Sequence, residues 1–190
     1  MAKVQLNPIL EQVRGQVGDL VFRRYGDEVV ISRKPDLSDQ EFTPAQLQTQ
    51  ERFRQAVLYG KMVMADPEEK ALYEQEAEAE GKPIFSLMIA DFFHAPSVDT
   101  IDLSGYTGAV DDQIVVQADD DFDVESVDVA ILNTNGDLIE SGAAVESPQE
   151  SGRWVYTATT AVDPGTDVRI AVTAADRPGS LTTGEEEKSL

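Results

Sequence analysis

The stretch Gly18-Asp-Leu-Val-Phe-Arg-Arg-Tyr-Gly-Asp-Glu-Val-Val-Ile-Ser-Arg-Lys-Pro35 has the pattern of a β-hairpin. Two short runs rich in Val, Ile and Phe, residues 20–24 and 28–33, flank Tyr25-Gly26-Asp27, where glycine permits the positive φ of a tight turn. Pro35 ends the second predicted strand. An isolated two-stranded ribbon is marginally stable in water, so we expect it to lie on a helical layer, on another chain, or on both.

The predicted hairpin also carries four basic residues in an otherwise acidic chain. Together they could form a basic face that docks on an acidic surface, because electrostatic complementarity sets orientation and encounter rate. Alternatively, these side chains alternate between the two faces and simply guard an edge strand by charge. On the first interpretation the predicted partner-binding residues are Phe22, Arg23, Arg24, Tyr25, Arg33 and Lys34.

The net charge of −21 is concentrated in the C-terminal half. Residues 1–96 contain 11 Lys and Arg against 16 Asp and Glu, net −5, whereas residues 97–190 contain 4 against 20, net −16. Such a surface repels nucleic acids and anionic membranes and favours basic partners, cations or solvent. We therefore expect protein partners, either further copies of the chain or the components of a particle; the acidity is also typical of a saline habitat.

The chain contains no cysteine, which excludes disulfides, thiolate metal sites and cysteine nucleophiles. Its first eight residues, Met-Ala-Lys-Val-Gln-Leu-Asn-Pro, lack the apolar run of a secretory signal. No later segment approaches the roughly 20 apolar residues of a membrane span. We expect synthesis in the cytoplasm, whatever assembly the chain later joins, a virion included.

Helix-start signals follow the hairpin. Thr43 and Gln46 have the spacing of a capping box, and Pro44 suits the first helical position, so a helix is predicted from there to about Met64. Its predicted buried stripe is Phe53, Ala56, Val57, Gly60 and Met64.

Two further helices are predicted before residue 96. Asp66 and Pro67 begin one that Gly81 ends, and Pro83 precedes a third that is apolar on nearly all sides. The N-terminal half is thus predicted to contain an extended arm over residues 1–17, then the hairpin and three-helix unit over residues 18–96.

From residue 97 the pattern changes to short alternating runs separated by turn signals such as Asn133-Thr-Asn-Gly-Asp137 and Asp163-Pro-Gly165. Six or seven strands at this spacing predict an immunoglobulin-like β-sandwich over residues 97–183, with Trp154 in its core. Residues 184–190 are predicted to be a solvated acidic tail. The predicted fold class is α+β.

Clustered carboxylates between two predicted strands form a candidate calcium site: Asp119, Asp120, Asp121 and Asp123. Oxygen ligands on a sandwich loop can hold this cation, although the D-x-D-x-D-G spacing is absent. A charged, solvated loop explains the same residues. No other cofactor is expected.

The only histidine, His94, follows the third predicted helix. Without a second histidine or a cysteine, multi-histidine metal sites and imidazole–thiol pairs are excluded. A position beside the negative end of a helix dipole favours a capping or packing role. No pair of acids is distinguished from the general surplus as a hydrolytic site, and the chain is predicted not to be an enzyme.

Two stretches resemble known families. Gly15-x-Val17-Gly18, the run ending in Arg33-Lys-Pro35, then Thr43-x-x-Gln46 and Arg52-Phe53, resemble uncharacterised bacterial and phage proteins in which this leader and helices precede an immunoglobulin-like domain. The resemblance covers about half the chain and implies a structural or virion role without catalytic residues.

The second resemblance is in the second predicted helix. Asp66-Pro-Glu-Glu-Lys-Ala-Leu-Tyr73 is similar to the stretch that leads into the last helix of HMG-box proteins. That family bends DNA with a basic surface and inserted apolar side chains. Here the matching helix carries Glu74, Glu76, Glu78 and Glu80, the wrong charge for phosphate.

Three functional hypotheses follow. The leading one is a non-enzymatic structural protein of a phage or phage-like particle, with a capsid-stabilising, decoration or tail-associated role. The second is a calcium-dependent adhesive or carbohydrate-binding module. The third is DNA binding through the helical unit, which would require salt-sensitive affinity.

Overall fold

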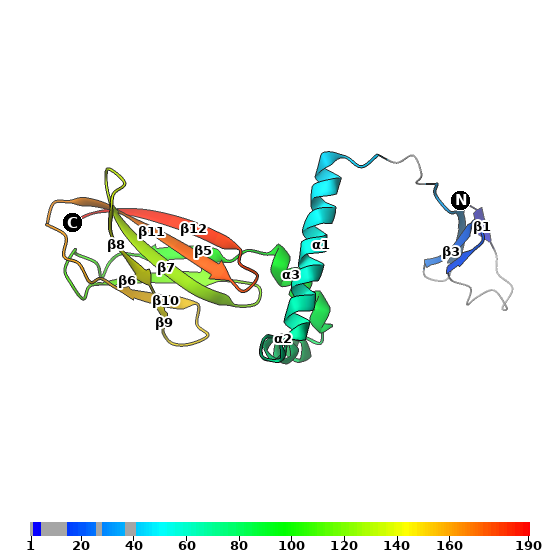
Figure 1. Ribbon diagram of the computed structural model, residues 1–190, viewed down its shortest axis with the longest axis horizontal. Helices are drawn as coiled ribbons and strands as arrows, with labels where there is room; N and C mark the ends of the chain where they lie inside the picture. The colour runs from blue at the N-terminus through cyan, green and yellow to red at the C-terminus, as the bar shows by residue number, and fades with distance from the viewer. Residues whose placement is uncertain (1, 5–14, 26–27, 37–40) are drawn as a thin grey trace. The chain divides into compact units, whose positions relative to one another are not determined.

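The computed structural model describes residues 2–4, 15–25, 28–36 and 41–190 (Figure 1). Over these residues the fold is mixed α+β, with three helices and three four-stranded antiparallel sheets. The chain divides into two compact units, Met1–Leu47 and Gln48–Leu190. This division differs from the predicted boundaries at residues 17/18 and 96/97, because the hairpin belongs to one unit and nearly all of the helical part to the other.

The first unit is one small sheet in the order β1-β4-β3-β2. The predicted hairpin strands are confirmed as β3 (Leu20–Tyr25) and β4 (Glu28–Arg33), whose predicted turn residues 26–27 lie outside the described residues. The interpretation of residues 1–17 as an arm is corrected in part. Its two described ends form β1 (Ala2–Val4) and β2 (Gly15–Val17), which pair with the outer edges of the hairpin.

Three helices follow the first sheet, and the predicted starts of the first two are confirmed. In α1 (Pro44–Ala65) the Thr43 backbone N–H donates to Gln46 Oε1 at 2.9 Å, and the Gln46 N–H donates back to Thr43 Oγ1 at 3.3 Å. In α2 (Pro67–Glu80) the Asp66 carboxylate accepts from the Glu68 and Glu69 N–H groups. These bonds satisfy backbone donors that have no partner within the helix.

The predicted stripe of α1 is partly wrong. Ala56 and Gly60 are buried together with Val63, whereas Phe53 is 53% and Met64 42% exposed. α1 packs against a short helical pair in which Gly81 ends α2 with a left-handed φ of 66° and α3 (Ile84–Phe93) follows Pro83. The helical core is a cluster of Val63, Tyr73, Ala77, Leu87 and Met88.

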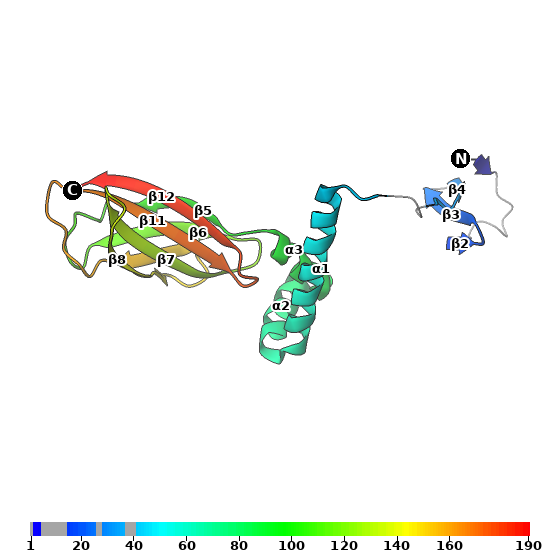
Figure 2. The ribbon, with the colours of Figure 1, turned by 45° about the horizontal axis from the view of Figure 1, so that its top comes forward.

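After α3 the chain forms two antiparallel sheets that enclose one core (Figures 1 and 2). The first, in the order β5-β6-β10-β9, comprises β5 (Ser97–Asp102), β6 (Gln113–Asp119), β10 (Arg153–Thr157) and β9 (Val145–Glu146). The second, in the order β12-β11-β7-β8, comprises β12 (Leu181–Ser189), β11 (Asp167–Asp176), β7 (Val124–Asn133) and β8 (Leu138–Ala143).

Alternating side chains of these strands fill the space between the sheets. The core includes Ile114, Ile131, Ile170 and, as predicted, Trp154, which is 8% exposed. Every second residue of β11 is buried, which is the burial pattern of a strand with one face on a core.

The prediction of a solvated tail at residues 184–190 is wrong. Gly184–Ser189 belong to β12 and pair with β11 from Val172 to Asp167, and Leu190 packs against the core. The run of three glutamates obscured this strand, because charged residues are depleted in strands and their burial pattern here is that of an exposed edge.

Candidate functional site

A buried polar cluster joins the three helices to the two-sheet part of the second unit. Tyr59 of α1, Tyr73 of α2 and Asp91 of α3 form a chain of hydrogen bonds. Tyr73 donates its hydroxyl proton to Asp91 Oδ2, so the Tyr59 hydroxyl, 2.7 Å from that of Tyr73, is the donor in the other bond. Tyr73 is fully buried and Asp91 is 1% exposed.

The same tyrosine contacts the loop between β6 and β7. Its ring stacks on Phe122 with a centroid separation of 4.1 Å and an interplanar angle of 8°. This contact closes one side of the cluster with an aromatic face, and such pairs stabilise by about 1 kcal/mol beyond their buried area.

Three acidic side chains lie in or beside this cluster: Asp91, Asp120 and Asp176. Asp91 Oδ1 and Asp176 Oδ2 are buried without a hydrogen-bond partner in the described structure. Burial raises the pKa of Asp91 to about 7; the Tyr73 hydroxyl opposes this rise, and the nearby Asp120 and Asp176 add to it. Burial also raises the pKa of Asp120, because its carboxylate is poorly solvated there.

The pKa values of the two tyrosine hydroxyls are also raised. Burial raises the pKa of Tyr59 to about 12, and burial together with the bond to Asp91 raises the pKa of Tyr73 further. Both phenols are therefore neutral donors at physiological pH, and neither can serve as a base. The cluster can hold or release one proton at Asp91 near neutral pH.

Arg177, in the turn after β11, connects the two-sheet part to α2. It donates to Asp123 Oδ2 at 3.0 Å and to Glu69 Oε2 at 3.3 Å. Burial of the guanidinium disfavours its charge, but the bond to Asp123 and the charges of Asp123 and Glu69 outweigh this and raise its pKa. The guanidinium thus supplies positive charge beside an acidic cluster and fixes the helices against the β6–β7 loop.

The four predicted calcium ligands have separate surroundings in the structure. Asp119 ends β6, Asp120 is partly buried beside Asp91 and Asp176, Asp121 pairs with His94 Nδ1, and Asp123 pairs with Arg177. Over the described residues, no three acidic or histidine side chains converge as ligands of a metal ion would. Asp121 and Asp123 are thus paired with basic side chains of the same chain, and calcium binding at this loop stays a prediction.

His94 follows the C-terminus of α3, where its backbone N–H donates to the carbonyls of Ala90 and Asp91. Its exposed ring pairs with Asp121 across to the β6–β7 loop. A role in ending the helix agrees with the interpretation of the sequence. The ion pair with Asp121 adds a second contact between α3 and the two-sheet part.

The predicted basic group of the hairpin is divided by the strand register. Because side chains alternate along a strand, Phe22 and Arg24 of β3 share one face with Arg33 of β4, whereas Arg23 and Tyr25 lie on the other face. Lys34 follows β4, and its N–H donates to the Asp19 carbonyl at 2.7 Å. The basic residues therefore do not form a single face. This favours the alternative that they alternate between the two faces and guard an edge strand by charge.

Sequence reasoning missed Tyr59, Tyr73 and Asp91. One signal was available: Asp91 is the only charged residue of the otherwise apolar α3. An acid in such a helix needs a buried donor, and tyrosine is a typical one. The identity of that donor could not be read from the sequence, because it depends on how α1 and α2 pack.

Comparisons with known proteins add little to these observations. No protein-family model matches the sequence, and no curated protein matches it. Among solved structures, CopC from Methylosinus trichosporium OB3b is similar to part of the chain, with 14% sequence identity and a TM-score of 0.37 over 48% of this chain and 89% of CopC. A likeness at this level carries no argument about fold or function. No helix in the described part of the chain is long and apolar enough to cross a membrane.

Proposed function

We propose that this chain is a non-enzymatic structural component of a larger assembly, a phage or phage-like particle, in a capsid-stabilising, decoration or tail-associated role. We further propose that its two-sheet part has an immunoglobulin-like arrangement. The antiparallel pairing of all its strands and the single core between two sheets support this second point.

The observation that carries the assembly role is the exposure of apolar side chains on the sheet of the first unit. Among residues 15–25 and 29–33, whose burial the structure describes, only Val29 is buried, while Val17 is 64%, Leu20 43% and Tyr25 63% exposed. A sheet is stable when at least one face is covered by another layer. A partner surface in an assembly would supply that layer.

Charge supports the same role. The first unit has six Lys and Arg against seven Asp and Glu, net −1, whereas the second has nine against 29, net −20. An attachment unit that is nearly neutral can approach a partner without repulsion, and a strongly acidic unit stays solvated. The predicted attachment residues are Phe22, Arg23, Arg24, Tyr25, Arg33 and Lys34, and the strand register divides them: Phe22, Arg24 and Arg33 lie on the face of Leu20, whereas Arg23 and Tyr25 lie on the other face. We place the attachment on the face of Phe22, Arg24 and Arg33.

The test is particle association in the source strain. A tagged chain should sediment with particles in a density gradient, and a Leu20→Asp variant, changed on the face of Phe22, Arg24 and Arg33, should remain folded but leave the particle fraction. Leu138→Asp, at a residue of β8 that is 59% exposed, is the matched control and should stay with the particles. Absence of the wild-type chain from every particle fraction would refute the proposal.

A further inference from the structure

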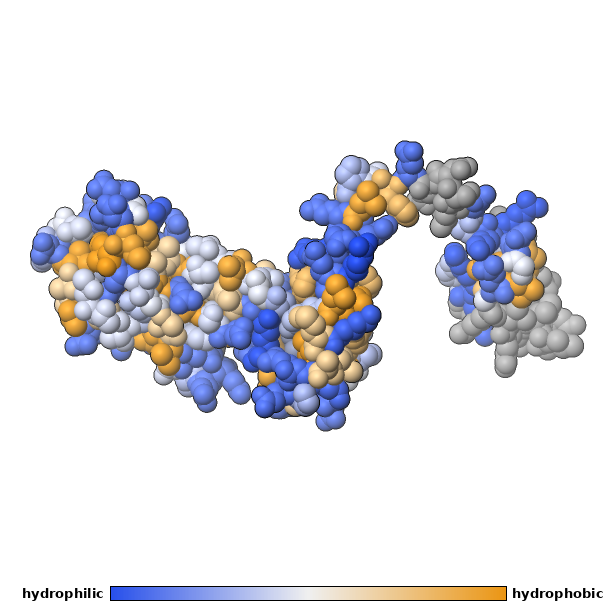
Figure 3. Space-filling view, viewed as in Figure 1, coloured by the Kyte–Doolittle hydropathy of each residue, from blue (hydrophilic) through white to orange (hydrophobic). Residues whose placement is uncertain are grey.

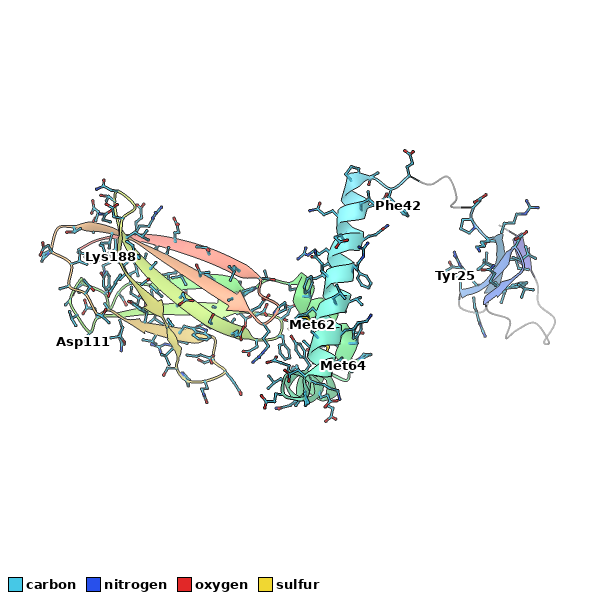
Figure 4. All side chains as sticks on the ribbon, viewed as in Figure 1. Tyr25, Phe42, Met62, Met64, Asp111 and Lys188 are labelled. Atoms are coloured by element: carbon cyan, nitrogen blue, oxygen red, sulfur yellow. The ribbon has the colours of Figure 1, made fainter. Side chains whose placement is uncertain are left out.

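The outer face of α1 exposes large apolar side chains although it lies opposite the helical core. Leu47, Leu58 and Met62 are 52%, 55% and 67% exposed, while Ala56 and Val63 are buried. At about 100° per residue, Leu47 lies half a turn around the helix axis from Ala56. Figure 3 shows patches of hydrophobic surface on α1, interrupted by hydrophilic surface, and Figure 4 labels Met62 on this helix. Large side chains on the solvent face of a helix are typical of an interface.

The residues of this outer face have a self-complementary order. Leu47, Glu51, Arg54 and Leu58 are separated by three, two and three residues, so they fall on one stripe about 60° wide. The order Leu-Glu-Arg-Leu becomes Leu-Arg-Glu-Leu when it is read from the other end. In an antiparallel pair related by a two-fold axis between residues 52 and 53, Leu47 faces Leu58 and Glu51 faces Arg54 of the other copy.

Both charged residues are available for such pairing. The Glu51 side chain is 50% and the Arg54 side chain 69% exposed, and within one chain they are 2.9 Å apart. In the antiparallel pair each arginine lies between two glutamates, one from each copy. The alternative register with Leu47 opposite Met62 places Glu51 against Leu58, which buries a carboxylate without a partner.

The charge of the helix also permits self-association in an acidic protein. α1 carries Arg52, Arg54 and Lys61 against Glu51, net +2. In contrast, α2 carries six glutamates against one lysine, net −5. Two copies of a chain with a net charge of −21 can approach most easily through the helix that is not acidic.

We propose that α1 is the self-association surface of this protein and pairs antiparallel with α1 of a second copy through Leu47, Glu51, Arg54 and Leu58. This dimer is independent of the proposed role in a particle: it forms with purified protein and needs no other component.

The experiment measures the mass of the full-length protein by light scattering at a series of concentrations. Wild type should have twice the mass of one chain. In a dimer of the Glu51→Arg variant, arginines stand at both position 51 of one copy and position 54 of the other. In a dimer of the Arg54→Glu variant, glutamates stand at both positions. Each variant alone should therefore raise the dissociation constant of the dimer by about tenfold or more. An equimolar mixture of the two variants should form a heterodimer, because every cross pair is then complementary, and the double variant should dimerise as wild type does.

Substitution of two exposed leucines completes the test. Leu58→Glu should give a monomer, whereas Leu138→Glu, with a similar exposed fraction on β8, should remain a dimer. Circular dichroism checks that each variant keeps its helices. A monomeric wild type up to about 0.1 mM would overturn the proposal and assign the apolar face to a different partner. Dimeric single variants, or a mixture that does not recover, would also overturn it.

Discussion

The two units contain sheets of the same size and pairing but differ in what covers them. Of residues 15–25 and 29–33 in the first unit, whose burial the structure describes, only Val29 is buried. In the second unit two such sheets face each other and enclose a core that includes Ile114, Ile131 and Ile170. Strand pairing satisfies the backbone in both cases, but only a second layer removes apolar side chains from water.

The two units also differ in charge. The second unit carries nearly all of the negative charge, net −20, while the first is nearly neutral. A large buried core can offset repulsion between surface charges, and the second unit has such a core. Three measurements on the purified chain would test whether the two units differ in this way.

The largest effect is expected from deletion of residues 184–190. This removes most of β12, exposes the edge of β11 from Asp167 to Val172 and takes Leu190 off the core. We expect loss of cooperative unfolding of the second unit, measured by the fluorescence of Trp154, the only tryptophan.

A charge-neutralised control separates structure from acidity in that experiment. Glu185→Gln/Glu186→Gln/Glu187→Gln keeps the strand and removes three charges, so it should unfold much as wild type does. An unchanged transition in the deletion variant would mean that these residues are a tail after all.

A smaller effect is expected from a matched pair of core substitutions. Ile170→Ala removes a fully buried side chain between the sheets and should lower the free energy of unfolding of the second unit by about 2–5 kcal/mol in urea denaturation. Ile31→Ala changes a half-buried residue of β4 and should leave the Trp154 transition unchanged. A shift of that transition by Ile31→Ala would show that the two units unfold together.

The smallest effect is a pH dependence from Asp91. The pKa of this acid is raised from 3.8 to about 7 by burial, with Asp120 and Asp176 adding to the rise and Arg177 opposing it. The folded state therefore binds the proton more tightly than the unfolded state, and stability is lost as the pH rises through the folded pKa. From about pH 5 to pH 7 we expect a loss of about 2 kcal/mol in the free energy of unfolding.

The control for this prediction is Asp91→Asn, which can still accept the Tyr73 bond through its amide oxygen. In this variant the stability should be nearly constant over the same pH range. An equal pH dependence in both proteins would assign the effect to other acids, Asp120 first, whose pKa burial also raises.

Local signals predicted much of the secondary structure correctly. The hairpin strands were read from two β-rich runs, and the starts of α1 and α2 were read from Thr43, Gln46 and Asp66, whose capping bonds are all present. These features depend on residues within a few positions of one another, so the sequence contains all the information that they need.

Errors occurred where the answer depended on distant segments. The glutamates of residues 185–187 suggested a tail, but these residues pair with the edge of β11 as part of β12. Phe53 and Met64 fit a helical stripe, but the position of α2 and α3 selected Ala56, Gly60 and Val63 as the buried side of α1.

Composition and local pattern were sufficient for the starts of α1 and α2, the hairpin strands, the absence of thiol chemistry and the acidity of the C-terminal half. The meeting of Tyr59, Tyr73 and Asp91, and the link from Glu69 through Arg177 to Asp123, became known from the fold alone. Burial and hydrogen bonding across elements depend on packing between residues far apart in the chain, which no local spacing specifies.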